Sequence, residues 1–174
     1  AHRLDRPVSG CLILGKTSKA LSRLHDSFKY HKVEKTYIAI SHLTPMVKSS
    51  VLENYLLKDS NSNITKIVSE GVKGAKWAQL KYNCLAYDSH HSLIQIHPKT
   101  GRSHQIRVQL SGNKTPIIGD VKYHGQRWES KSAIALHCIK MKLMHPVTKE
   151  EIEFKSLPNF KLSWSKFKRK IISI

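Results

Sequence analysis

Asp5 is the residue whose type and surroundings first suggest chemistry. It stands between Arg3 and Arg6 in the opening stretch AHRLDRPVSG. An opposite charge within about 4–6 Å favours the ionised form of an aspartate, and a carboxylate that acts as a nucleophile must be ionised at neutral pH. Spacing alone favours a structural salt bridge over such a role, because ion pairs are common and active sites are few.

The charge balance of the chain points to a polyanionic partner. The 174 residues include 30 Lys and Arg against 12 Asp and Glu, a formal net charge of +18, with one concentrated basic patch at residues 166–170. A field of this sign attracts polyanions, of which nucleic acid is the usual one. The hydrophobic content of 40% and the charged content of 24% indicate one globular domain over residues 1–174, and they exclude a disordered polycation.

The cysteines and histidines suggest neither disulfides nor a metal site. Cys11, Cys84 and Cys138 are isolated, which is typical of reduced, mostly buried thiols. The 11 histidines show no paired ligand spacing, so we expect no metal, and His90 and His91 are expected in an exposed loop. No run approaches the roughly 20 apolar residues that cross a bilayer, and no signal peptide is visible, so we expect a soluble, cytoplasmic protein.

Strands and helices must position these groups. The apolar run at residues 11–14 is typical of a buried strand. Thr17 and Ser18 offer an N-cap for a helix over residues 18–30, with Leu21, Leu24 and Phe28 on its apolar face.

The rest of the chain is mainly predicted as strands. Ser103 could cap a further helix, with Ile106 and Leu110 on one apolar face. Residues 166–170 are interpreted as an electrostatic surface or a frayed tail. The mixture predicts the α+β class. Strand patterns cover residues 35–40, 51–57, 65–69, 78–84, 93–97, 133–144 and 150–154, with a polar turn at residues 59–63.

Three motifs together resemble those of the RluA-type pseudouridine synthases. HRLDRPVSG is similar to HRLDxxTSG, with Val8 in place of the usual Thr, and makes Asp5 the candidate catalytic aspartate. KTYIAI is similar to K-x-Y-x-A, whose tyrosine, here Tyr37, packs on the target base. KTGRSHQIRVQL is similar to TGRxHQIRxH/Q, whose second arginine, here Arg107, pairs with the aspartate. Further matches in PIIGDVKYHG and ALHCIKMKLMHP extend the resemblance from residue 2 to about residue 146.

The resemblance implies a pseudouridine-synthase core: a bent, mixed, mainly antiparallel sheet flanked by helices, with the active cleft across its middle. It implies isomerisation of a flipped-out uridine in structured RNA, rRNA or tRNA, by a monomer that uses no cofactor and no metal. Arg3, Arg102 and His104 lie inside the motifs and are expected to contact RNA or support the site. His2 and Gly10 are expected to shape the loop around Asp5.

Family members usually carry a further segment before HRLD, with a V-x-K-P-x-G type motif. This chain begins at Ala1, so we expect that segment to be absent. Two alternatives to catalysis therefore stay open. One is a non-catalytic RNA-binding protein on the same scaffold, and the other is a structural basic protein bound to ribosomes.

Overall fold

One eight-stranded sheet organises residues 2–130 and 132–174, the part of the chain that the computed structural model describes. Every strand pair in it is antiparallel except β1 with β7, and the strand order is β1-β7-β2-β6-β5-β3-β4, with β8 beside β7. The strands are β1 (Ser9–Gly10), β2 (Glu34–Ser41), β3 (Ser49–Asp59), β4 (Ile64–Val68), β5 (Lys76–Tyr87), β6 (Ser92–Pro98), β7 (Leu136–Met144) and β8 (Glu151–Lys155).

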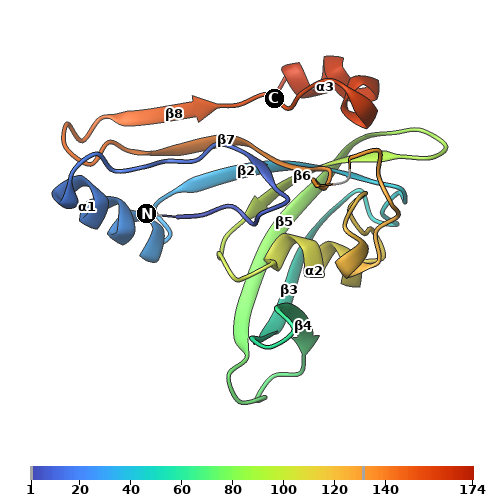
Figure 1. Ribbon diagram of the computed structural model, residues 1–174, viewed down its shortest axis with the longest axis horizontal. Coiled ribbons are helices and arrows are strands. Elements are labelled where there is room, and N and C mark those ends of the chain that lie inside the picture. Colours follow the sequence, from blue (N-terminus) through green and yellow to red (C-terminus); the bar gives the residue numbers. More distant parts are fainter. Residues whose placement is uncertain (1, 131) are drawn as a thin grey trace.

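Helices flank this sheet, so the predicted α+β class with a mixed, mainly antiparallel sheet is confirmed (Figure 1). Figure 1 shows α2 below the strands and α3 above them, while β3, β4 and one end of β5 extend below the rest. No helix of the described residues is long and apolar enough to cross a membrane. The helices are α1 (Ser18–Lys29), α2 (Gln105–Gly112) and α3 (Lys168–Ile172), with 3-10 turns η1 (Val121–Tyr123) and η2 (Leu162–Phe167).

The central strands β2 and β6 are buried at most of their residues. In β2 the consecutive residues Ile38, Ala39 and Ile40 are all fully buried, which is the pattern of a strand that is covered on both faces. At the C-terminal end, Phe167 and Ile171 are buried in the same core. The interpretation of residues 166–170 as a frayed tail is therefore wrong, because the apolar side chains of this segment anchor it.

The predicted strand at residues 11–14 is wrong. Cys11 is buried and donates its backbone N–H to the Cys138 carbonyl, but the chain then leaves β7, and Leu12 and Leu14 are exposed. The reason lies in β7, which pairs with β1 at Cys138 and with β8 from Lys140 onward. No ladder position on that edge of β7 is left for the residues that follow Cys11.

Helix α1 begins as predicted, because Thr17 Oγ1 accepts the backbone N–H of Ala20 at 3.2 Å. Fewer of its apolar side chains are buried than predicted. Leu24 is buried and Phe28 is half-buried, but Leu21 is 42% exposed. The remaining strand predictions are confirmed with shifted ends, the largest shifts being three residues, at the start of β7 (Leu136 in place of residue 133) and at the end of β5 (Tyr87 in place of residue 84).

Candidate active site

Arg107 is a buried cation held by a buried carboxylate. The side chains of α2 from Gln105 to Leu110 are all buried, so the guanidinium of Arg107 lies inside the protein. It donates from Nε to Asp120 Oδ2 and from Nη2 to Asp120 Oδ1, both at 2.7 Å. Burial lowers the pKa of Arg107, but the hydrogen bonds and charge of Asp120 outweigh this effect and raise it overall. The bidentate pair therefore fixes both the charge and the orientation of the guanidinium.

Asp5 meets the remaining side of the same guanidinium. Nη1 of Arg107 lies 3.5 Å from Asp5 Oδ2. The carboxylate of Asp5 sits at the head of a turn closed by the backbone N–H of Val8, which donates to the Asp5 carbonyl at 2.9 Å. Its side chain is 30% exposed, against 6% for Arg107. Asp5 is thus anchored from one side and open to a ligand from the other.

The expectation that Asp5 is held between its sequence neighbours is wrong. Among the described residues, its ion pair is with Arg107, and neither Arg3 nor Arg6 forms one with it. The Asp5 carboxylate contacts Arg107 of α2 instead. The half-buried side chain of Val8 packs against the main core, where it fills the place of the threonine usual in the motif.

The loop before α2 is held by Gln105, not by Ser103. Gln105 Oε1 accepts the Thr100 hydroxyl at 2.7 Å and the backbone N–H of Arg102 at 3.0 Å. The predicted N-cap at Ser103 is wrong, because the cap position is His104, in the left-handed conformation (φ 51°) and without a side-chain cap. The side-chain amide of Gln105 replaces the predicted hydroxyl cap as the brace of this loop.

His104 belongs to a buried polar chain with Tyr123. Tyr123 Oη accepts the backbone N–H of Thr65 at 2.9 Å and lies 2.7 Å from His104 Nδ1. The Tyr123 hydroxyl and His104 Nδ1 thus share one hydrogen bond, and the tautomer of the imidazole decides which of the two donates. Burial lowers the pKa of His104, with the charge of Asp5 opposing this effect, so the imidazole is neutral at pH 7. The Arg107 guanidinium lies 4.9 Å from the Tyr123 ring centroid, which joins this chain to the arginine.

Tyr37 lies on β2 beside this cluster. Burial raises the pKa of Tyr37 well above its usual value, and the neighbouring Cys138 and Asp5 add to the effect. The phenol therefore stays protonated at any physiological pH. Its ring is half-buried between the main core and the cluster of Cys11, Cys138 and Met141. Burial also raises the pKa of Cys138 to about 12, so this thiol stays protonated at neutral pH, and the three cysteines are free as predicted.

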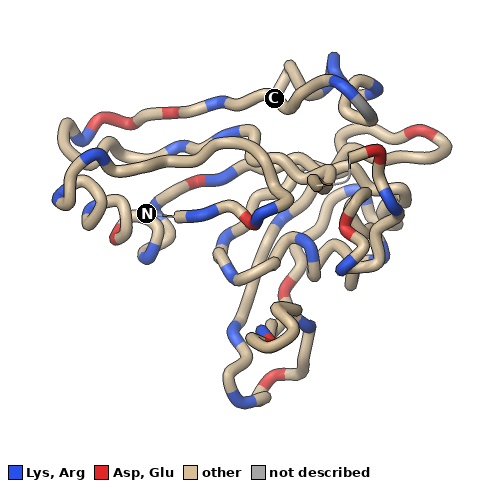
Figure 2. Tube along the Cα trace, viewed as in Figure 1, with Lys and Arg blue, Asp and Glu red and all other residues tan. Residues whose placement is uncertain are grey.

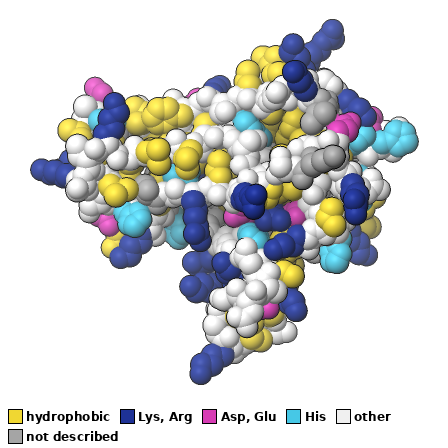
Figure 3. Space-filling model, viewed as in Figure 1, with side chains coloured by type: hydrophobic (Ala, Val, Ile, Leu, Met, Phe, Trp, Pro, Cys, Tyr) yellow, Lys and Arg dark blue, Asp and Glu magenta, His cyan; other side chains and the backbone are white. Residues whose placement is uncertain are grey.

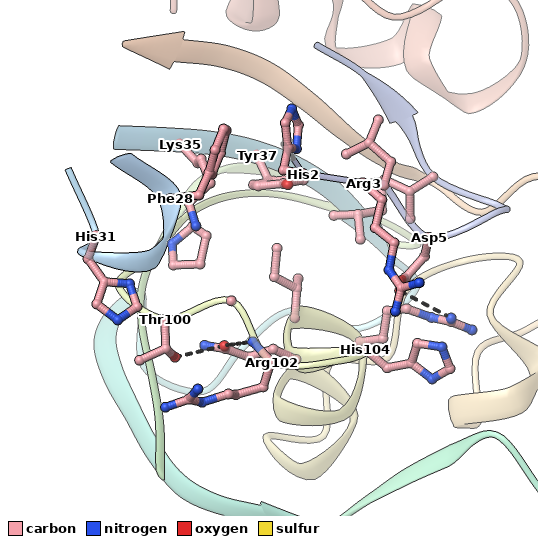
Figure 4. A pocket seen from close by; sticks show the side chains of 18 of the residues that line it. His2, Arg3, Asp5, Phe28, His31, Lys35, Tyr37, Thr100, Arg102 and His104 are labelled. Carbon is pink, nitrogen blue, oxygen red and sulfur yellow. Dashed lines mark hydrogen bonds and ion pairs between the residues drawn. The ribbon is translucent and has the colours of Figure 1, made fainter. Parts of the chain in front are cut away.

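One cavity of about 760 Å³ brings the predicted site residues together, within the usual size range of ligand pockets. In Figure 4, Lys35, Tyr37 and Phe28 form one wall, Thr100 and Arg102 the opposite wall, and Arg3 and Asp5 one end. His2 also lines it, and its Nε2 accepts the backbone N–H of Ile13 at 3.0 Å, in keeping with a loop-shaping role. All six predicted site residues line this cavity: Asp5, Tyr37, Arg107, Arg3, Arg102 and His104.

Sequence reasoning missed two residues of this site. Asp120 and Tyr123 both come from the stretch PIIGDVKYHG, which was matched to the family without a role for either residue. The sequence signal that could have identified them was the presence of an acidic and an aromatic residue, Asp120 and Tyr123, in a stretch that resembles a family motif. Within the described residues, no group of three or more His, Cys, Asp or Glu side chains is placed to hold a metal ion.

Known pseudouridine synthases are similar to this chain in sequence. The family described as RNA pseudouridylate synthase matches residues 1–112, which include Asp5, Tyr37 and Arg107. The tRNA pseudouridine synthase C of Salmonella typhi is 34% identical over 167 residues, covering 85% of this chain and 63% of that protein. The ribosomal large subunit pseudouridine synthase C of Buchnera aphidicola is 34% identical, covering 87% of this chain and 50% of that protein. The chain thus spans less than two thirds of the length of these relatives.

Solved structures of related proteins share the fold. Human RNA Pseudouridylate Synthase Domain Containing 4 has a TM-score of 0.76 at 25% identity, covering 91% of this chain and 71% of its own. Human RNA Pseudouridylate Synthase Domain Containing 1 has a TM-score of 0.76 at 22% identity, covering 99% of this chain and 79% of its own. From the family match over more than half of its residues, together with these relatives, the chain belongs to the RNA pseudouridylate synthase family.

Proposed function

We propose that this protein is an RNA pseudouridine synthase that isomerises specific uridines of structured rRNA or tRNA, with Asp5 as the catalytic carboxylate. The single observation that carries the proposal is the position of Asp5, at 3.5 Å from a buried arginine and at one end of a cavity that Tyr37 also lines. An anion held in this way, beside a nucleotide-sized space, is the main chemical requirement of the reaction.

The reaction breaks the N1–C1′ bond of uridine and forms a C5–C1′ bond after the base has rotated. No atom is gained or lost overall, because the proton that leaves C5 is balanced by the proton that N1 acquires. Asp5 acts on the sugar, either by attack at carbon or by removal of a proton. Both routes require the carboxylate form, which the positive charge of Arg107 favours.

Tyr37 provides the surface on which the flipped base stacks. An aromatic ring stacks on any pyrimidine face and contributes about 1–3 kcal/mol per base, which offsets the few kcal/mol that base flipping costs. Because the pKa of the Tyr37 hydroxyl is raised by burial, the hydroxyl carries no charge at neutral pH. The ring therefore presents no negative charge that would repel the substrate or Asp5.

The rim of the cavity suits a polyanion. Arg3 and Arg102 line it from two different segments, and the neutral imidazole of His104 lines it as well. Figure 3 shows Lys and Arg side chains gathered around acidic ones at the centre of this face, and Figure 2 shows basic residues along most of the chain. We assign Arg3, Arg102 and His104 to RNA contacts, since phosphates are the commonest partners of such groups.

The names of the relatives suggest the class of RNA. The Salmonella protein is named for tRNA and the Buchnera protein for large-subunit ribosomal RNA, so we propose one of these as the substrate here. The proposed enzyme acts in the cytoplasm as a monomer, with residues 1–174 as its catalytic domain and without a cofactor or metal.

The test is to incubate the purified chain with unmodified total RNA and to map new pseudouridines, with Asp5→Asn in parallel. We expect discrete new sites with the wild type and none with Asp5→Asn, at similar RNA affinity. Asp59→Asn, the same change at an exposed residue at the end of β3, is the control and should retain activity. Tight RNA binding by the wild type without any new pseudouridine would contradict the proposal and favour a non-catalytic RNA-binding protein.

A further inference from the structure

Lys35 is a cation of the cavity wall that has no acidic partner. It takes part in none of the ion pairs of the described residues. Its neighbour Glu34 precedes it on β2 and is exposed, so the strand alternation directs the Glu34 carboxylate to the other face. By contrast, Arg107 in the same cavity is neutralised by Asp120 and Asp5.

The ammonium of Lys35 reaches across the cavity toward the loop before α2. Lys35 Nζ lies 3.8 Å from the position that a Cβ atom on Gly101 would occupy. Because residue 101 is glycine, no side chain covers the ammonium from that direction. Burial lowers the pKa of Lys35, with the sulfur of Cys138 as the opposing influence, so this cation is partly removed from water without a counter-charge. Such a group gains most from a ligand that carries a full negative charge.

Lys35 and Tyr37 share one face of β2. Both line the cavity, while Thr36 between them lines a separate cavity of about 330 Å³. Two residues along a strand separate their Cα atoms by about 7 Å, so the lysine and the tyrosine arise from adjacent positions on one wall of the cavity. A nucleotide whose base stacks on Tyr37 therefore occupies the same cavity as the unpaired ammonium of Lys35.

From this geometry, and resting on the proposed function, we propose that Lys35 forms an anion subsite that binds a phosphate group of the target nucleotide. Phosphate is favoured over a carbonyl oxygen of the base because it carries a full negative charge, and the Lys35 ammonium has no negatively charged partner of its own. Lysine binds phosphate as a point charge. Lys35 thereby holds the nucleotide so that its sugar stays at Asp5 while the base is detached and turned.

The experiment compares the binding of uridine 5′-monophosphate with that of uridine. Dissociation constants are measured by calorimetry or NMR titration for the wild type, Lys35→Met, Lys35→Arg and Lys32→Met. Methionine keeps the unbranched shape of the lysine stem without its charge. Lys32 is exposed and lies outside the cavity, so Lys32→Met controls for the loss of one positive charge near the site.

We expect the wild type to bind the monophosphate more tightly than the nucleoside, and Lys35→Met to lose about tenfold or more in affinity for the monophosphate alone. Lys35→Arg and Lys32→Met should keep the preference. An equal loss for both ligands would overturn the phosphate subsite and assign Lys35 to the base, and equal binding of both ligands to the wild type would overturn it as well. These measurements need no turnover, so the absence of pseudouridine formation would count against the proposed function only.

Discussion

Arg107 donates two hydrogen bonds of 2.7 Å to Asp120, while its distance to Asp5 is 3.5 Å. The two carboxylates therefore have different relations to one guanidinium. Asp120 is 1% exposed and fixes the arginine, whereas Asp5 is 30% exposed and lies farther from the guanidinium, open to a ligand. Because Asp120 holds the guanidinium, Arg107 stays in place while its positive charge stabilises the ionised form of Asp5.

Asp120→Ala should destabilise the protein strongly, because it leaves the buried charge of Arg107 with Asp5 alone. Breaking a buried pair costs about 3–5 kcal/mol, which for a domain of this size lowers Tm by roughly 6–20 °C. Thermal unfolding measures the shift. The control is Glu153→Gln, which removes an exposed partner of Lys140 and should cost less than about 1 kcal/mol. Equal shifts for the two variants would refute the bracing role of Asp120.

Tyr37 should act through its ring and not through its hydroxyl. Tyr37→Phe keeps the stacking surface, so pseudouridine formation should stay within about threefold of the wild type. Tyr37→Leu keeps the apolar bulk without the aromatic face and should lose about 10- to 100-fold, from a stacking contribution of about 1–3 kcal/mol. Single-turnover rates on one mapped RNA site make the comparison. A Tyr37→Phe variant as inactive as Tyr37→Leu would show that the hydroxyl takes part in the chemistry.

Tyr123→Phe should cost stability through a lost hydroxyl. The substitution leaves the buried backbone N–H of Thr65 and Nδ1 of His104 without their shared partner, and an unsatisfied buried group costs about 1–3 kcal/mol. Urea unfolding measures this loss. Tyr30→Phe makes the same change on an exposed ring and should be close to neutral. If Tyr123→Phe were equally neutral, the polar chain would contribute nothing to the site's rigidity.

Acidification should destabilise the fold, and His137 should account for part of the effect. Ser156 carbonyl and Ser9 hydroxyl oxygens lie 2.9 and 2.8 Å from its two ring nitrogens, and burial lowers the pKa of His137 below 6.5, against the opposing effect of the Ser156 contact. The unfolded chain therefore takes up this proton at a higher pH than the folded one. The stability contributed by the neutral ring is complete above about pH 6.5 and is lost as the pH falls below it.

Tm measured from pH 7.5 down to pH 5 tests this dependence. His137→Gln should lower Tm at pH 7.5 but should flatten its fall toward pH 5. His90→Gln, in the exposed loop before β6, is the control and should keep the wild-type slope. If His137→Gln kept the wild-type slope of Tm against pH, His137 would not be the source of this pH dependence.

The motifs predicted which residues converge but not how they are held. Asp5, Tyr37 and Arg107 were expected at one site, and all three line one cavity, although only tertiary folding brings β2, α2 and the first turn together. The identity of the bracing groups depended on that folding. Local propensity pointed to a cap at Ser103, where the side chain of Gln105 braces the loop instead. Sequence neighbours suggested Arg3 and Arg6 as partners of Asp5, whereas its ion pair is with Arg107, the partner that the motif resemblance implied.

Strand prediction failed for residues 11–14, because another segment pairs with the edge of β7 that these residues would need. The apolar run at residues 11–14 has the composition of a strand, but β8 occupies the edge of β7 that this run would need. Composition cannot reveal such an exclusion, because it depends on a segment more than 130 residues away.

The most direct test of the central claim is the map of new pseudouridines in unmodified total RNA after incubation with the wild-type chain and with Asp5→Asn. We expect discrete sites that the wild type creates and that Asp5→Asn does not, while both proteins bind the RNA with similar affinity. The same sites formed by Asp5→Asn would contradict the role of its carboxylate, and no sites from the wild type despite tight RNA binding would contradict the proposed activity itself.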